Sequence, residues 1–347
     1  MAKMMRAMVL EKLSDLNTES HPLRLVECPR PEPAADEVRI RVTVCGVCHT
    51  ELDEIEGRTP PPQFPVILGH QVVGWIDKVG DAVTTRQSGE RVGVAWIFSA
   101  CGDCRWCRGG LENLCPQFRA TGRDADGGYA EYMVVPATFA YPLPDLFSDA
   151  EAAPLLCAGA IGYRSLALAK LDSGGALGLT GFGASAHLVL KLVRYQYPNL
   201  PVYVFARSEK EQHFALELGA TWAGSTEDVA PTLMESIIDT TPAWLPVMAA
   251  LRQLEPAGRL VINAIGKESS DRELLAKLDY PRDLWMEKEI KSVANVTRHD
   301  VIEFLRLAAE IPLHPTFEEF PLEDANRALL ELKNRKIRGA KVLRISE

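Results

Sequence analysis

The sequence predicts an α/β protein that combines a β-rich domain with a domain built on a doubly wound parallel sheet. In the first 150 residues, short stretches alternate between apolar and polar side chains, which is typical of half-buried strands. After residue 154, apolar stretches alternate with segments of helical periodicity, which is typical of parallel strands joined by helices. The length of 347 residues also favours two domains over one.

The β-rich part begins with a predicted strand at 37–44, where every second residue is a valine or isoleucine. Further strands are predicted at 72–79, 90–96 and 130–135, and the loops between them carry most of the cysteines. The C-terminal tail adds predicted helices at 300–310 and 323–334 and a strand at 340–345. We expect residues 1–152 and 294–347 to form one domain.

The second domain is predicted at 153–293. Its strands are expected at 176–180, 202–205, 237–239, 259–265 and 290–293, with helices at 186–197 and 209–218. Ser208 and Glu211 have the spacing of a capping box at the start of the second helix. The alternation of strand and helix predicts parallel pairing.

The formal net charge of −9 argues against nucleic acid or an anionic membrane as a partner, because both bind basic surfaces. The longest apolar stretch, 152–163, is too short to cross a bilayer, so no membrane span is expected. The N-terminus lacks the apolar segment of a secretory signal. These features predict a cytoplasmic protein.

Eight cysteines need an explanation in a compartment where disulfides are rare. Four of them fall within fifteen residues, at Cys101, Cys104, Cys107 and Cys115. Four thiolates on one short loop can close a tetrahedron around zinc and leave no position for substrate, which predicts a structural site. Free thiols and an iron–sulfur cluster are the alternatives.

A second set is Cys48, His70 and Cys157, in the segments Cys48-His-Thr-Glu, Gly69-His-Gln and Pro154-Leu-Leu-Cys-Ala-Gly. Taken singly, a buried cysteine is more often a small apolar residue. The order of these segments, together with the four-cysteine loop, Asp126-Gly-Gly-Tyr-Ala-Glu-Tyr and Gly181-Phe-Gly-Ala-Ser-Ala-His, resembles the zinc-dependent alcohol dehydrogenases of the medium-chain dehydrogenase/reductase superfamily. The resemblance covers nearly the whole chain and implies a GroES-like catalytic domain and a Rossmann domain.

The resemblance implies that Cys48, His70 and Cys157 bind a catalytic zinc, so that each chain holds two zinc ions. Three protein ligands leave a position for substrate, where the metal can lower the pKa of an alcohol or polarise a carbonyl. Thr50 matches the hydroxyl that takes the alcohol proton, although an ordinary loop hydroxyl is the alternative. Trp96 matches a substrate-pocket aromatic or is a core tryptophan, and Cys45 is expected to pack in the core.

Three residues depart from the family pattern. Glu51 replaces the usual aspartate and is still expected to orient His70 through its second ring nitrogen. Gln71 replaces a glutamate, which puts any role of that carboxylate near zinc in doubt. Asp53 replaces a relay histidine, so the outer part of the proton path is uncertain.

The stretch Gly181-Phe182-Gly183-Ala184 lies between a predicted strand and a predicted helix, as in a Rossmann turn that binds a pyrophosphate. A tight turn without a ligand is the alternative. By resemblance, Ile265, His49 and Arg338 also approach the cofactor. The strand that usually ends in an acid for NAD ends here in Ala206, Arg207 and Ser208, which favours NADP over NAD.

The resemblance therefore implies reversible hydride transfer between a primary or secondary alcohol and NAD(P), in a homodimer or homotetramer, with a small alcohol or aldehyde as the only other partner. A polyol dehydrogenase or an aldehyde reductase of the same superfamily is the nearest alternative. The zinc-free quinone reductases are disfavoured because they lack the four-cysteine loop. A catalytically silent zinc protein is the alternative from another class.

Overall fold

The computed structural model describes residues 3–171, 174–311, 313–334 and 339–346. The chain divides into two compact units, of which the first contains Met1–Cys157 and Val296–Glu347 and the second contains Ala158–Asn295. The first unit is β-rich and the second is built on a parallel sheet. The predicted fold class is therefore confirmed.

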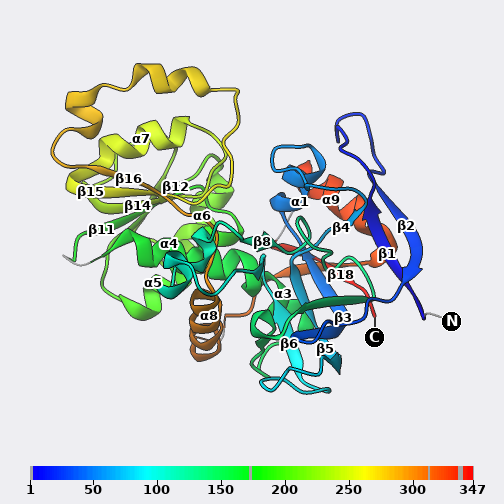
Figure 1. The fold of residues 1–347 in the computed structure, drawn as a ribbon. Coiled ribbons are helices and arrows are strands. Elements are labelled where there is room, and N and C mark those ends of the chain that lie inside the picture. Colours follow the sequence, from blue (N-terminus) through cyan, green and yellow to red (C-terminus); the bar gives the residue numbers. More distant parts are fainter. Residues whose placement is uncertain (1–2, 172–173, 312, 335–338, 347) are drawn as a thin grey trace. The chain divides into compact units, whose positions relative to one another are not determined.

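The first unit has one large sheet and two small ones. The large sheet has the order β10 (Tyr141–Pro142), β6 (Arg91–Val94), β5 (Gln71–Val79), β3 (Glu37–Val47), β18 (Ala340–Arg344) and β17 (Phe317–Pro321), and β9 (Tyr132–Pro136) also pairs with β3. The small sheets are β2 (Leu23–Pro29) with β1 (Met4–Leu10) and β4 (Val66–Ile67), and β7 (Ile97–Ser99) with β8 (Arg119–Ala120). In Figure 1 the red C-terminal strand β18 lies among the blue and cyan strands, where it pairs with β3.

Strand β3 forms the centre of this unit. Val38, Ile40, Val42 and Val44 are fully buried, which explains the strict alternation in the sequence. The strand runs three residues beyond the prediction and ends at Val47, directly before Cys48. The predicted strands near 72–79, 90–96, 130–135 and 340–345 are present as β5, β6, β9 and β18.

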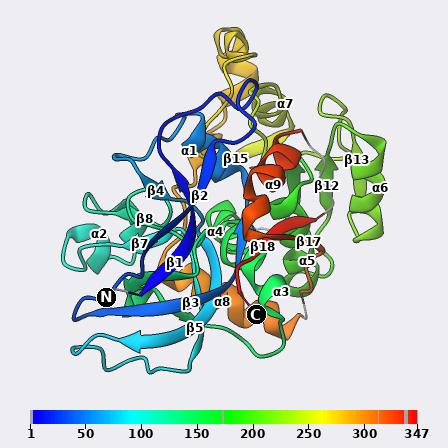
Figure 2. The same ribbon diagram turned by 90° about the vertical axis from the view of Figure 1, so that its right-hand side faces the viewer.

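The helices of the first unit are α1 (His49–Ile55), α2 (Arg105–Arg108), α3 (Asp149–Pro154), α8 (Arg298–Glu310) and α9 (Ala325–Lys333). Helix α9 packs beside β17 and β18 (Figure 2). Its Glu331 accepts a hydrogen bond of 2.7 Å from Lys341 of β18. Helices α8 and α9 were predicted, whereas α1 was not.

The second unit holds six parallel strands in the order β13 (Trp222–Gly224), β12 (Val202–Phe205), β11 (Ala176–Thr180), β14 (Met234–Asp239), β15 (Leu254–Ile262) and β16 (Glu289–Ser292). Its helices are α4 (Ala160–Ala169), α5 (Ala184–Gln196), α6 (Glu209–Glu217) and α7 (Leu245–Gln253). The chain starts at the central strand β11, builds outward to β13 and then returns to build the other half. This order is that of a Rossmann sheet, which binds ligands at the carboxyl ends of the strands where the order reverses.

A continuous helical segment, Asp149–Ala169, joins α3 through a π-helical turn, Leu155–Gly159, to α4. By length and composition alone this segment of 21 residues could cross a membrane. It is longer than the apolar stretch 152–163 on which the expectation of no membrane span was based. However, 67% of its most apolar window is buried inside the protein. The core helix of a globular protein passes the same test, and the burial of this segment agrees with that role.

Candidate active site

Cys48 lies at the junction between the central strand and a short helix. It is the N-cap of α1, and its Sγ accepts a hydrogen bond of 3.4 Å from the backbone N–H of Thr50. Glu51 completes the capping box, because its Oε2 accepts a hydrogen bond of 2.8 Å from the N–H of Cys48. The cap thus fixes the direction in which the thiol leaves the strand.

His70 lies directly before β5, and the backbone around it is tightly packed. Gly69 has a φ of +98°, and a Cβ at this position would lie 2.4 Å from the ring of Tyr129 and 2.8 Å from Sγ of Cys45. Only glycine tolerates both the left-handed conformation and this approach. Cys45 is fully buried and contributes to this packing, as the sequence predicts.

The structure brings Cys48, His70 and Cys157 together, with their ligand atoms within 4.8 Å of one another. Nε2 of His70 lies 3.6 Å from Sγ of Cys48 and 3.3 Å from Sγ of Cys157. Zinc bound tetrahedrally by nitrogen and sulfur would hold these atoms about 3.6 Å apart. Cys157 reaches this position from the π-helical turn, a local widening that is frequent at functional sites.

The electrostatics around the three candidate ligands favour a cation between them. Burial lowers the pKa of His70, but the charges of Glu51 and Cys48 outweigh it and raise that pKa well above its usual value. A hydrogen bond with Cys157, followed by burial, raises the pKa of the Cys48 thiol. The charged form of Cys48 is therefore disfavoured as long as no cation lies beside it. A divalent metal would supply the missing charge, and the donor set fits zinc.

Glu51 lies behind His70 on the side away from the cysteines. Its Oε1 is 2.6 Å from Nδ1 of His70, and the two side chains are 0% and 1% exposed. The two atoms are close enough for an ion pair, but they do not meet the angle of a regular hydrogen bond. A carboxylate at this position orients the ring so that Nε2 faces the sulfurs.

The other residues predicted near this site are placed as follows. Thr50 is buried in the first turn of α1, directly beside Cys48. Trp96 is half-buried, with its ring centroid 5.2 Å from that of Phe118. Gln71 begins β5 with a buried side chain. Asp53 pairs with Arg58 at 2.5 Å, and burial raises the pKa of Asp53.

Glu54 is a buried acid near this site that the sequence analysis did not single out. It is fully buried, and neither carboxyl oxygen makes a regular hydrogen bond to the described residues. Burial, followed by the charge of Glu51, raises its pKa well above the usual value. Glu54 could have been found from the sequence, because it is three residues from Glu51 and positions three apart on a helix share one face. Helix α1 itself was not predicted, so this spacing could not be used.

The four-cysteine loop lies between β7 and β8. The sulfurs of Cys101, Cys104, Cys107 and Cys115 lie within 4.8 Å of one another. Sγ of Cys107 is 3.8 Å from Sγ of Cys101 and 3.6 Å from Sγ of Cys104. Four sulfurs around zinc in a tetrahedron would lie about 3.8 Å apart. The loop therefore has the geometry of a structural zinc site.

Backbone N–H groups point at the sulfurs of this loop. The N–H groups of Cys101 and Gln117 donate to Sγ of Cys115 at 3.4 Å and 3.3 Å. A hydrogen bond from the backbone of Cys107 lowers the pKa of Cys104 to about 7. In contrast, a hydrogen bond with Asp103 raises the pKa of Cys101, and burial raises that of Cys107, so a cation would be needed to hold all four as thiolates. Thiolates are the form that binds metal.

One ion pair, which was not predicted from the sequence, ties this loop to the C-terminal tail. Glu112 is 5% exposed and accepts four hydrogen bonds from Arg298, at the start of α8. The shortest are 2.7 Å long. Residues 186 apart in sequence give no local pattern that would predict such a pair.

The glycine turn of the second unit follows β11. Gly181 has a φ of +77°, and its N–H donates a hydrogen bond of 2.8 Å to the carbonyl oxygen of Phe205 on β12. Gly183 is the N-cap of α5, and a Cβ added there would meet no atom within 4 Å. Phe182 is buried and Ala184 is exposed. The first turn of α5 is thus open, as a backbone site for a pyrophosphate requires.

The remaining predicted cofactor residues are distributed over both units. Ala206 is buried at the end of β12, whereas Arg207 and Ser208 are exposed. Ile265 follows β15 and is 48% exposed. His49 is exposed as the first residue of α1, in the first unit, and Arg338 lies outside the described residues.

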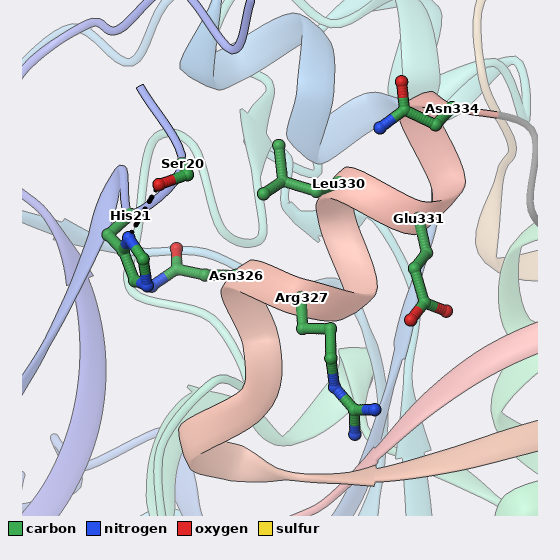
Figure 3. A pocket seen from close by; sticks show the side chains of 7 residues that line it. All are labelled: Ser20, His21, Asn326, Arg327, Leu330, Glu331 and Asn334. Carbon is green, nitrogen blue, oxygen red and sulfur yellow. Dashed lines mark hydrogen bonds between the residues drawn. The ribbon is translucent and has the colours of Figure 1, made fainter. Parts of the chain in front are cut away.

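A surface hollow of about 320 Å³ lies beside α9 and contains none of the predicted site residues (Figure 3). Several of its polar groups already have partners within the protein. Ser20 and His21 share a hydrogen bond of 2.8 Å, and Asn326 bonds the backbone of Leu23 through both of its amide atoms. We do not place the active site there.

Comparison with known proteins agrees with the geometry. Residues 34–145 match the alcohol dehydrogenase GroES-like domain. The chain is 43% identical over 332 residues to the probable alcohol dehydrogenase AdhA of Mycobacterium tuberculosis, with 94% of each chain covered. This chain belongs to the zinc-type medium-chain alcohol dehydrogenase family. An alcohol dehydrogenase of Geobacillus stearothermophilus is 31% identical, over 97% of this chain and 99% of that protein.

Solved structures of the family share the fold. A cinnamyl alcohol dehydrogenase of Sorghum bicolor is 26% identical with a TM-score of 0.83, covering 99% of this chain and 98% of that one. A cobalt- and zinc-bound alcohol dehydrogenase of Pyrobaculum aerophilum has a TM-score of 0.86 at 24% identity, covering 99% of this chain and 100% of that one. The predicted family is confirmed, and a nicotinamide cofactor is implied by family membership.

Proposed function

We propose that this protein is a zinc-dependent alcohol dehydrogenase that transfers hydride reversibly between a primary or secondary alcohol and a nicotinamide dinucleotide. The observation that carries the proposal is the convergence of two sulfurs and one imidazole, Cys48, His70 and Cys157. When bound, zinc would supply a Lewis acid for the alcohol or carbonyl oxygen, and the nicotinamide would accept or return the hydride. A second zinc is proposed in the four-cysteine loop.

The protein's own residues have distinct tasks in this proposal. His70 and the two cysteines hold the metal, and Glu51 keeps Nε2 of His70 directed at it. Oγ1 of Thr50 takes the proton of the alcohol, for which its place directly after Cys48 and His49 is suited. The backbone amides of the Gly181–Gly183 turn bind the pyrophosphate.

We also propose that NADP is preferred to NAD. Ala206 offers no carboxylate to the adenosine ribose, and the exposed guanidinium of Arg207 can pair with a 2′-phosphate. Absorbance at 340 nm with a panel of alcohols and aldehydes tests both proposals in one assay. We expect turnover and a higher kcat/KM with NADP than with NAD. Absence of turnover in a fully zinc-loaded sample would favour a silent zinc protein, and a preference for NAD would refute the cofactor assignment alone.

We further propose a cytoplasmic homodimer or homotetramer. All eight cysteines are free, as suits a reducing compartment. Strand β16 lies at the edge of its sheet with all four side chains exposed, and the nearby Trp285 and Met286 are 55% and 53% exposed. An open edge with apolar neighbours is a template for pairing with a second chain. A monomeric mass by light scattering would contradict the oligomer.

A further inference from the structure

A carboxylate closes the N-terminal turn of α6. Oε2 of Glu211 accepts hydrogen bonds from Ser208, at 2.9 Å from Oγ and 3.3 Å from the backbone N–H. In return, Oγ of Ser208 accepts a hydrogen bond of 3.2 Å from the N–H of Glu211. This capping box, predicted from the sequence, holds the acidic group of Glu211 against the residue expected to contact the cofactor.

This turn lies next to the glycine turn in the sheet. Strands β11 and β12 are parallel neighbours, with Thr180 opposite Phe205, and Gly181 bonds the carbonyl of Phe205. Ser208 follows Phe205 by three residues. Helix α6 therefore starts one strand away from the glycine turn, and both lie at the carboxyl ends of the parallel strands. In this fold, the residues that end β12 face the adenosine ribose and decide whether a 2′-hydroxyl or a 2′-phosphate is accepted.

The positive and negative charges of this turn balance one another. Arg207 and Lys210 contribute two positive charges, and Glu209 and Glu211 contribute two negative charges, so the turn is neutral in sum. Of the two acids, Glu211 is held on Ser208, whereas Glu209 is exposed. A 2′-phosphate carries nearly two negative charges and would have to bind beside this fixed carboxylate. The Glu211 carboxylate also takes the place that the helix N-terminus offers to an anion.

We propose that Glu211 is a specificity-determining residue whose carboxylate, held by Ser208, limits the preference of this enzyme for NADP over NAD. Arg207 favours the 2′-phosphate and Glu211 opposes it, so the balance between the two residues sets the ratio. The inference rests on the proposed function, because it requires that a nicotinamide dinucleotide binds at the Gly181–Gly183 turn.

The test is the substitution Glu211→Gln. Glutamine retains an oxygen that can accept from Ser208, so the capping box is preserved while the charge is removed. We expect the ratio of kcat/KM with NADP to kcat/KM with NAD to rise about tenfold, because a like charge close to the phosphate is lost. Calorimetry should show the same change without turnover, as tighter binding of adenosine 2′,5′-bisphosphate relative to adenosine 5′-monophosphate.

Glu209→Gln is the matched control, since it removes the same charge from the same turn without touching Ser208. We expect Glu209→Gln to change the NADP-to-NAD ratio of kcat/KM by less than about twofold, against the tenfold change expected for Glu211→Gln. Equal effects of the two variants, or an unchanged ratio in Glu211→Gln, would overturn the inference. Failure of the wild-type protein to bind either nucleotide would instead refute the proposed function, so the two failures are distinguishable.

Discussion

Replacing Cys48 by alanine is expected to lower kcat/KM for alcohol oxidation by about 10³-fold or more and to remove one zinc ion from each chain. The reason is that two ligands, His70 and Cys157, are left to hold the metal, and a Lewis acid contributes several kcal/mol of transition-state stabilisation. Zinc counted by mass spectrometry and initial rates at 340 nm measure the two effects on the same sample. Retention of both zinc ions, with a rate within tenfold of the wild type, would contradict the proposed site.

A graded series sharpens this experiment. Glu51→Gln leaves all three ligands in place but removes the carboxylate at Nδ1 of His70, so zinc affinity or activity should fall by about 10- to 100-fold. Cys28→Ala is the matched control, because Cys28 is half-buried on β2 and belongs to neither cysteine group. It should retain both zinc ions and near wild-type rates.

Local pattern predicted most of the fold because burial here is periodic. The central strand β3 buries every valine of its alternating stretch, and β11 and β12 match the predicted ranges residue for residue. Helix α1 was missed because its sequence, HTELDEI, is rich in acids and its start is a cysteine cap that no common capping pattern includes. Its stability depends on contacts made by the folded chain, above all the pairing of Glu51 with His70 and with the backbone of Cys48.

The candidate metal ligands could not be derived from local pattern, because His70 is 22 residues from Cys48 and 87 residues from Cys157. Family resemblance named them, and the structure shows that their atoms converge. Ser208 illustrates the opposite case. Local pattern alone predicted its capping box with Glu211, and the structure confirms that pairing.

The four-cysteine loop is expected to depend on zinc for its stability, so Cys104→Ala should lower the Tm by about 10 °C. Between Cys101 and Cys115 the regular structure is limited to α2, with four residues, and a 3-10 turn, Glu112–Leu114. Among the described residues between Cys101 and Cys115, the buried ones are Glu112, Asn113 and Cys115. None of them is a large apolar side chain. Such a segment has too little apolar burial to offset the entropy of its own ordering.

The expected result is one zinc ion per chain, a lower calorimetric Tm and faster proteolysis between residues 101 and 115. Because Arg298 of α8 binds Glu112 within this loop, loosening should spread to the start of α8 and expose the amides there to hydrogen exchange. Cys28→Ala again provides the control and should leave the Tm unchanged within about 2 °C. If Cys104→Ala lost its zinc and kept the wild-type Tm and exchange pattern, the loop would be held by its backbone and the Glu112–Arg298 pair, and zinc would have no structural role there.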